Sequence, residues 1–113
     1  MLFGIPSISP FLCNGLPTNV FIGNGDTPNV GNDVILGTPG ADFIDAGAGD
    51  DTICGLGGAD LIFAGGGADY VGGRNGADLI FGEAGDDVLD GRTGEDMLDG
   101  GAGVDSISGG PQC

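Results

Sequence analysis

The chain has 113 residues, of which 27 are Gly and 6 are Pro, a composition typical of disordered segments unless a strict period is present. It has 17 acidic residues and only two basic ones, Arg74 and Arg92, with no Lys and no His. The formal net charge is therefore −15. Such a charge argues against nucleic acids and anionic membranes as partners, since both require basic patches, and no apolar stretch reaches the roughly 18 residues of a transmembrane segment. We therefore expect one small domain that attracts cations.

Residues 1–30 are expected to form an atypical N-terminal cap. They contain two short apolar segments, residues 11–13 and 20–22, which look like degenerate strands of the array that follows. The alternative is a disordered tail, which the apolar character of the segment disfavours. Residues 1–10 lack the basic residues of a cleavable signal peptide.

A nine-residue period runs through residues 31–110 and fixes three columns of residue types. The first column is acidic and consists of Asp33, Asp42, Asp51, Asp60, Asp69, Asp78, Asp87, Asp96 and Asp105. Two residues before each Asp stands a glycine: Gly31, Gly40, Gly49, Gly58, Gly67, Gly76, Gly85, Gly94 and Gly103. Two residues after each Asp stands an aliphatic residue: Ile35, Ile44, Ile53, Ile62, Val71, Ile80, Leu89, Leu98 and Ile107. Three columns in one register make the period specific.

Each nonapeptide is predicted to be one Gly-rich turn followed by one very short strand, whose single aliphatic residue points inward. Two nonapeptides then make one coil. The expected fold class is all-β: a right-handed parallel β-roll, or β-solenoid, with two short-stranded sheets and 18 residues per coil. Stacking places equivalent turns about 4.8 Å apart.

The acidic column predicts calcium binding. Glycines allow the backbone carbonyls of each turn to point inward, and carboxylate and carbonyl oxygens are the ligands that Ca²⁺ requires. In the stacked roll, Asp33, Asp51, Asp69, Asp87 and Asp105 line one edge, and Asp42, Asp60, Asp78 and Asp96 line the other. Ions between successive turns would number about seven, which nearly balances the charge. A purely structural role for these residues as turn formers is the alternative.

Segments such as Gly-Ala-Gly-Asp-Asp-Thr-Ile at residues 47–53 resemble the repeats-in-toxin (RTX) pattern G-G-x-G-x-D-x-U-x, and the resemblance covers residues 28–110. It implies calcium ligands from backbone carbonyls at the first and third or the second and fourth positions, together with the Asp carboxylates. The fourth-position carbonyls would be those of Gly40, Gly49, Gly58, Gly67, Gly76, Gly85 and Gly94. Departures at the second position are Leu56, Arg74, Glu83 and Arg92, and the arginines are expected to weaken adjacent sites. Pro28 and Asn29 depart from the pattern in the first repeat.

The outward positions of one predicted sheet form an apolar surface. They are Phe43, Leu61, Leu79 and Met97 in one row and Asp45, Phe63, Phe81 and Asp99 in the next. Such continuity is typical of a contact surface. The alternative is that the N-terminal segment folds back over it.

The three cysteines are expected not to form a disulfide within one chain. If Cys13 is an outward residue of a degenerate strand, it lies two coils from Cys54, roughly 9–10 Å away, beyond the limit of about 7 Å between Cα atoms. Cys113 belongs to residues 111–113, which are expected to be an uncapped C-terminal end. Only a head-to-tail neighbour would then bring Cys113 close to Cys13.

These features predict a binding or structural module rather than an enzyme, because without His or Lys the acid–base candidates are carboxylates already needed for calcium. We expect an extracellular or cell-surface calcium-binding structural protein that associates with itself, end to end or through the apolar sheet, as a homo-oligomer, filament or surface layer. The alternative is a calcium-dependent folding and secretion module of a larger RTX-type enzyme or adhesin.

Overall fold

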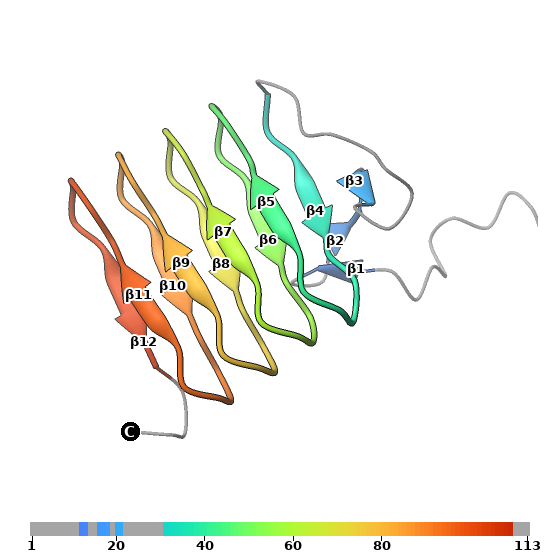
Figure 1. The fold of residues 1–113 in the computed structure, drawn as a ribbon. Coiled ribbons are helices and arrows are strands. Elements are labelled where there is room, and N and C mark those ends of the chain that lie inside the picture. Colours follow the sequence, from blue (N-terminus) through green and yellow to red (C-terminus); the bar gives the residue numbers. More distant parts are fainter. Residues whose placement is uncertain (1–11, 14–15, 19, 22–30, 110–113) are drawn as a thin grey trace, which may run out of the picture.

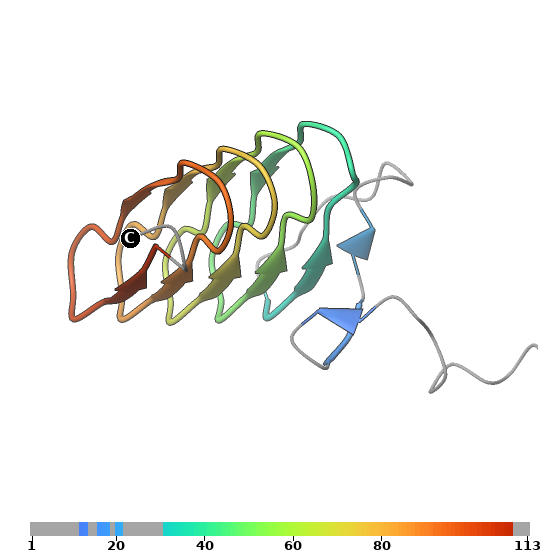
Figure 2. The same ribbon diagram turned by 90° about the horizontal axis from the view of Figure 1, so that it is seen from below.

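The computed structural model describes residues 12–13, 16–18, 20–21 and 31–109. Within these residues the chain forms twelve short strands and no helix. The strands lie in successive coils stacked along one axis, with a layer of strands on either side of the interior (Figures 1 and 2). The predicted parallel β-roll is confirmed.

Each of the nine repeats forms one three-residue strand that begins directly after its column aspartate. These strands are β4 (Val34–Leu36), β5 (Phe43–Asp45), β6 (Thr52–Cys54), β7 (Leu61–Phe63), β8 (Tyr70–Gly72), β9 (Leu79–Phe81), β10 (Val88–Asp90), β11 (Met97–Asp99) and β12 (Ser106–Ser108). Three residues suffice because the glycine-rich segment that follows turns the chain toward the opposite layer.

The strands alternate between two parallel sheets. The larger sheet has the order β12-β10-β8-β6-β4-β3, and the smaller has the order β11-β9-β7-β5. Ile35 pairs with Ile53 and Ile53 pairs with Val71, so each coil advances the chain by 18 residues, as predicted. Because of this register, each residue of a column lies beside the residue 18 positions later, in the next coil.

The aliphatic column fills the space between the sheets. Seven of its members, from Ile35 to Leu89, are 0–1% exposed. Val20, Ala46 and Ala64 join them in the same core cluster, which the three-column pattern did not predict. Toward the C-terminal end the column loses its cover, because Leu98 is only partly buried and Ile107 is 50% exposed.

The N-terminal strands differ from the expectation. β3 (Val20–Phe21) does extend the roll, because it pairs in parallel with β4. However, β1 (Leu12–Cys13) pairs antiparallel with β2 (Leu16–Pro17), so these residues do not form a further coil. β1 packs against β4 and β6 of the six-stranded sheet. Antiparallel pairing of this kind does not occur within the stacked coils, whose strands pair in parallel.

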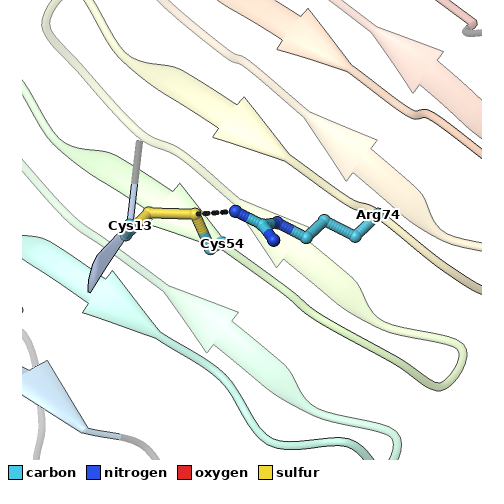
Figure 3. Close-up of a disulfide and its surroundings, with 3 residues drawn as sticks. All are labelled: Cys13, Cys54 and Arg74. Atoms are coloured by element: carbon cyan, nitrogen blue, oxygen red, sulfur yellow. Dashed lines mark hydrogen bonds between the residues drawn. A yellow bond between two sulfur atoms is a disulfide. The ribbon is translucent and has the colours of Figure 1, made fainter. Parts of the chain in front are cut away.

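The prediction that the cysteines cannot pair within one chain is wrong. Cys13 and Cys54 form a disulfide with their Cα atoms 5.6 Å apart (Figure 3). The predicted separation assumed that Cys13 lies in the sheet beside its neighbours, whereas β1 lies against the outer surface of the sheet that carries Cys54. Cys13, Leu36 and Cys54 form a second buried cluster there, flanked by Val34 and Leu56. Cys113 lies outside the described residues.

The outer surface of the four-stranded sheet is the apolar surface that the sequence predicted. Phe43 and Met97 are 63% and 68% exposed. The ring of Phe63 stacks on that of Phe81 at 5.1 Å between centroids and meets Phe43 edge-on at 5.9 Å. Among the described residues, the N-terminal strands β1 and β3 pack on the other sheet and do not cover this surface. No helix in the described part of the chain is long and apolar enough to span a membrane.

Candidate calcium-binding turns

Eight six-residue turns connect the two sheets, and each ends on a column aspartate. Edge 1 comprises the turns that follow strands of the six-stranded sheet, residues 37–42, 55–60, 73–78 and 91–96. Edge 2 comprises the turns that follow strands of the four-stranded sheet, residues 46–51, 64–69, 82–87 and 100–105. Asp33 also lies on edge 2, one coil before Asp51. The two acidic ladders therefore lie on opposite edges, with the members that the sequence predicted.

The turn geometry rests on two left-handed backbone positions. The fourth position has a positive φ in every turn from Gly49 to Gly103, with values from 85° to 107°. At Gly76, a Cβ would overlap the carbonyl oxygen of Gly58 in the preceding coil. Glycine is required there because stacked turns approach each other through their backbones. Gly40 is an exception and has no positive φ.

The second turn position is also left-handed in every turn except that at residues 37–42, even where it is not glycine. Leu56, Arg74, Glu83 and Arg92 have φ between 65° and 70°, a conformation that costs roughly 1–2 kcal/mol for a residue with a Cβ. Arg74 directs its guanidinium to Cys54 Sγ at 3.8 Å, and Arg92 pairs with Asp90 at 3.4 Å. Both arginines thus make their closest polar contacts with strands of the six-stranded sheet.

The column aspartates link the coils through one carboxylate oxygen. In seven of the nine, Oδ1 accepts a hydrogen bond from the backbone N–H of the aspartate 18 residues earlier. The seven bonds, from 2.7 to 2.9 Å, run from Asp33 to Asp51, Asp42 to Asp60, Asp51 to Asp69, Asp60 to Asp78, Asp69 to Asp87, Asp78 to Asp96 and Asp87 to Asp105. Through these bonds each of the seven carboxylates links its own coil to the preceding one.

The second carboxylate oxygen is buried and has no hydrogen-bond partner in six of these residues. They are Asp51, Asp60, Asp69, Asp78, Asp87 and Asp96. Burying a carboxylate oxygen without a partner is unfavourable, so repetition of this arrangement in turn after turn indicates a missing positive charge.

An oxygen-lined position lies beside this second oxygen. A Cβ built on Gly55, the first residue of its turn, would lie 2.6 Å from Asp60 Oδ2 and 3.2 Å from the carbonyl oxygen of Gly73 in the next coil. On Gly82 it would lie 2.7 Å from Asp87 Oδ2 and 3.0 Å from the carbonyl oxygen of Gly100 in the next coil. We call this position the cradle. Only the absence of a side chain at the first residue leaves it open.

The acidic ladders hold their protons more tightly than exposed carboxyls do. Burial raises the pKa of Asp60 and of Asp69 from 3.8 to about 7, although the backbone N–H of the preceding coil partly opposes the rise. For the same reasons the pKa of Asp51 and of Asp78 rises to about 6, and the pKa of Asp87 is also raised. Carboxylates of neighbouring coils add repulsion. A divalent cation would reverse this effect by favouring the ionised forms.

These turns fit calcium. Within the described ranges, no three His, Cys, Asp or Glu side chains converge in a way that could hold a metal ion, so backbone carbonyls must supply much of the coordination. Ca²⁺ accepts six to eight oxygen ligands, including carbonyls, and tolerates irregular geometry. The ion would be held by column aspartates such as Asp60, Asp78 and Asp87 with carbonyls of the glycine-rich turns, and it would supply the positive charge that their buried oxygens lack.

The turn at residues 37–42 differs from the others. The Thr38 N–H donates to Asp42 Oδ2 and the Thr38 hydroxyl donates to Asp42 Oδ1, each at 2.7 Å. Its carboxylate is therefore satisfied within its own turn.

Edge 2 carries a second polar ladder that the sequence analysis missed. Asn32 Oδ1 accepts the N–H of Asp50, whose Oδ1 accepts the N–H of Ala68, and Asp86 Oδ1 accepts that of Val104, at 2.7–2.9 Å. The signal in the sequence was a polar residue immediately before the column aspartate, which edge 2 has at three of its five positions, as Asn32, Asp50 and Asp86. On edge 1 alanine occupies this position in three of the four turns. The ladder stabilises the stacking of edge 2 through backbone donors.

Comparison with protein families identifies the array. The family model of the RTX calcium-binding nonapeptide repeat, in four copies, matches residues 28–62, 55–80 and 81–111. The match spans more than half of the chain, so the protein belongs to the RTX calcium-binding repeat family. Comparisons with curated proteins and with solved structures gave no significant match. RTX nonapeptide repeats bind calcium, and this chain forms a calcium-binding RTX β-roll.

Proposed function

We propose that the protein is an extracellular structural module that folds on binding calcium and associates with further copies of itself, and that it is not an enzyme. The observation that carries the proposal is the set of six buried, unpaired aspartate oxygens in the stacked turns. In the absence of a cation, these carboxylates repel one another inside a fold that has little else to stabilise it.

The interior supports dependence on calcium. Its core is built around a single column of aliphatic side chains, and the main cluster contains ten buried residues among those described. Ordering each residue costs on the order of 1–2 kcal/mol of conformational entropy, which so thin a core does not offset. A ligand that binds only the folded chain stabilises it by mass action, and several ions do so together.

The accessibility of the carboxyls supports a role other than catalysis. A pKa of about 7 would suit an acid–base catalyst, and Asp60 and Asp69 have such a value. However, these side chains are only 3% and 2% exposed, so a substrate could not reach them. Their place inside the turns suits an ion instead.

The disulfide between Cys13 and Cys54 supports an extracellular location. Disulfides persist in oxidising compartments such as the cell exterior, where calcium is also abundant. RTX repeat proteins are typically secreted, which agrees with this proposal.

The open C-terminal end of the roll supports association end to end. Ile107 belongs to the core column but is 50% exposed, and Val104 in the preceding turn is 81% exposed. β12 is the terminal strand of its sheet in the described part of the chain, and such a strand can pair with a neighbour. By contrast, the apolar sheet surface covers on the order of 200 Å² from its strand dimensions. A stable interface buries about 800 Å² per partner, so this surface alone is too small.

The test combines circular dichroism and sedimentation velocity on the full chain, in excess EGTA and in millimolar calcium. We expect an unfolded monomer in EGTA, and β structure with large species in calcium. A full β signal in EGTA would contradict calcium-dependent folding. A folded monomer in calcium would contradict self-association and favour a folding module whose open end is continued by other parts of a larger protein.

A further inference from the structure

The first residue of each turn decides whether its cradle is open. On edge 1 this residue is Gly37, Gly55, Gly73 or Gly91, and on edge 2 glycine occupies the position in the last two turns, as Gly82 and Gly100. A Cβ added to any of these six glycines would meet Oδ2 of the aspartate in the same turn at 2.5–2.7 Å. Where a following coil contributes a carbonyl oxygen, the position lies between the two.

The first two turns of edge 2 begin with alanine instead. Ala46 donates its N–H to the Phe63 carbonyl and Ala64 donates its own to the Phe81 carbonyl, each at 2.9 Å. Gly37 and Gly55 make the equivalent bonds to Cys54 and Gly72, so the backbone follows the same course at the first residue of all four turns. The alanine methyl groups therefore project toward the cradle. Ala46 is 1% exposed and Ala64 is 0% exposed, and both belong to the aliphatic core.

We propose that Ala46 and Ala64 close two calcium positions on edge 2, so that the turns ending at Asp51 and Asp69 bind no ion in their cradles. This inference rests on the proposed calcium dependence of the fold. A methyl group and a calcium ion cannot share a position whose nearest oxygens lie 2.5–3.2 Å away, only slightly beyond the roughly 2.3–2.6 Å of calcium ligands. The number of ions falls from the roughly seven expected from the repeat count to about five.

The two edges then have different roles. Edge 1 has an open cradle in every turn, whereas the N-terminal half of edge 2 replaces ions with apolar packing. Asp51 and Asp69 still accept the N–H groups of Asp33 and Asp51 through Oδ1, which keeps the coils in register without a metal. The polar ladder of Asn32 and Asp50 reinforces these same coils.

The test measures the number of calcium ions bound per chain, by equilibrium dialysis with elemental analysis and by native mass spectrometry. We expect the double variant A46G/A64G to bind two more ions than the unmodified protein. The matched control is A59G/A77G, which makes the same two changes at exposed fifth positions of edge 1 turns. It is expected to bind the unmodified number. An unchanged number in A46G/A64G, in a chain that folds with calcium, would overturn the inference.

The reciprocal variant is G73A, which closes a cradle on edge 1. Its new methyl group would meet Asp78 Oδ2 at 2.5 Å, and we expect the loss of one ion. If G73A folds in calcium and retains the full number of ions, the first position does not control occupancy and the inference fails. Should the unmodified protein bind no calcium, the proposed function itself would fail, a result distinct from both of these.

Discussion

The two carboxylate oxygens of a column aspartate have different environments, and substitution by alanine removes the interactions of both. At Asp78, Oδ1 accepts the Asp60 N–H at 2.9 Å, while Oδ2 is buried beside the cradle. Asp78→Ala removes both and leaves the Asp60 N–H without its acceptor. A buried hydrogen bond to a charged group contributes about 1.5–3 kcal/mol, so we expect the calcium midpoint of folding to rise by about tenfold or more.

The control for this prediction is Asp45→Ala. It removes the same charge from the exposed outer surface of β5. Circular dichroism titrations with calcium should leave its midpoint within about twofold of the unmodified protein. Equal shifts in the two variants would mean that total charge, rather than ligation in the turns, determines the response.

Glycine is required at the fourth turn position but not at every turn position, and two glycines illustrate the difference. Gly76 has a φ of 104°, and a Cβ there would overlap the Gly58 carbonyl oxygen. Gly66 has no atom within 4 Å of such a Cβ. We expect Gly76→Ala to destabilise the calcium-bound fold by more than about 2 kcal/mol. Gly66→Ala should change it by no more than about 1 kcal/mol, with stabilisation favoured. Urea unfolding in saturating calcium measures both, and similar losses would contradict the stacking argument.

At the level of the elements, the strands of the array could be predicted from the sequence, because the nine-residue period places the same residue types at the same position of every strand and turn. One inward aliphatic residue per repeat, such as Ile53, specifies the strand, and the 18-residue coil specifies its partners. Residues 12–21 have no such period, and the tight pairing of β1 with β2 follows from tertiary contacts with β4 and β6. The position of the disulfide depends on that packing and could not be predicted from spacing.

The candidate site was predictable in part for the same reason. The acidic column indicated which side chains face each edge, but not that Oδ1 and Oδ2 are used differently. The importance of Ala46 and Ala64 also emerged only from the backbone course, because an alanine in place of glycine is a small change in sequence. Its effect depends on the oxygen atoms around its methyl group.

The disulfide between Cys13 and Cys54 joins the β1–β2 hairpin to the six-stranded sheet across a sequence separation of 41 residues. Because the hairpin packs in its own cluster, the main core does not depend on it. We expect reduction in saturating calcium to lower the free energy of unfolding by about 2–4 kcal/mol while the β signal of the roll persists.

The measurement is a urea titration with and without a phosphine reductant, in a Cys113→Ser background that prevents exchange with the third cysteine. Cys54→Ser should reproduce the effect of the reductant. A denaturation midpoint that does not respond to reduction would show that the bond contributes no constraint. Complete loss of the β signal would show instead that the roll cannot fold without its N-terminal strands.

For the whole molecule, the formal charge of −15 and the single-column core make the calcium-free fold sensitive to protons. Burial raises the pKa of Asp51 and Asp78 to about 6 and that of Asp60 and Asp69 to about 7, all from 3.8. The folded chain therefore binds protons more tightly than the unfolded chain does. Stability from this source is fully present below about pH 4 and is lost as the pH rises through 6 to 7.

We therefore expect the calcium-free protein to become more stable as the pH falls from about 8 to about 5, since a carboxyl whose pKa rises from 3.8 to about 6 contributes on the order of 3 kcal/mol. Saturating calcium should reverse this trend, because the ion binds the ionised carboxylates and protons compete with it. Circular dichroism in EGTA and urea midpoints in saturating calcium across this range measure both trends, with the lower limit kept above the isoelectric point of about 4.1. A β signal in EGTA that stays constant or increases with pH would contradict the burial of these carboxylates, because exposed aspartates would already be ionised throughout that range.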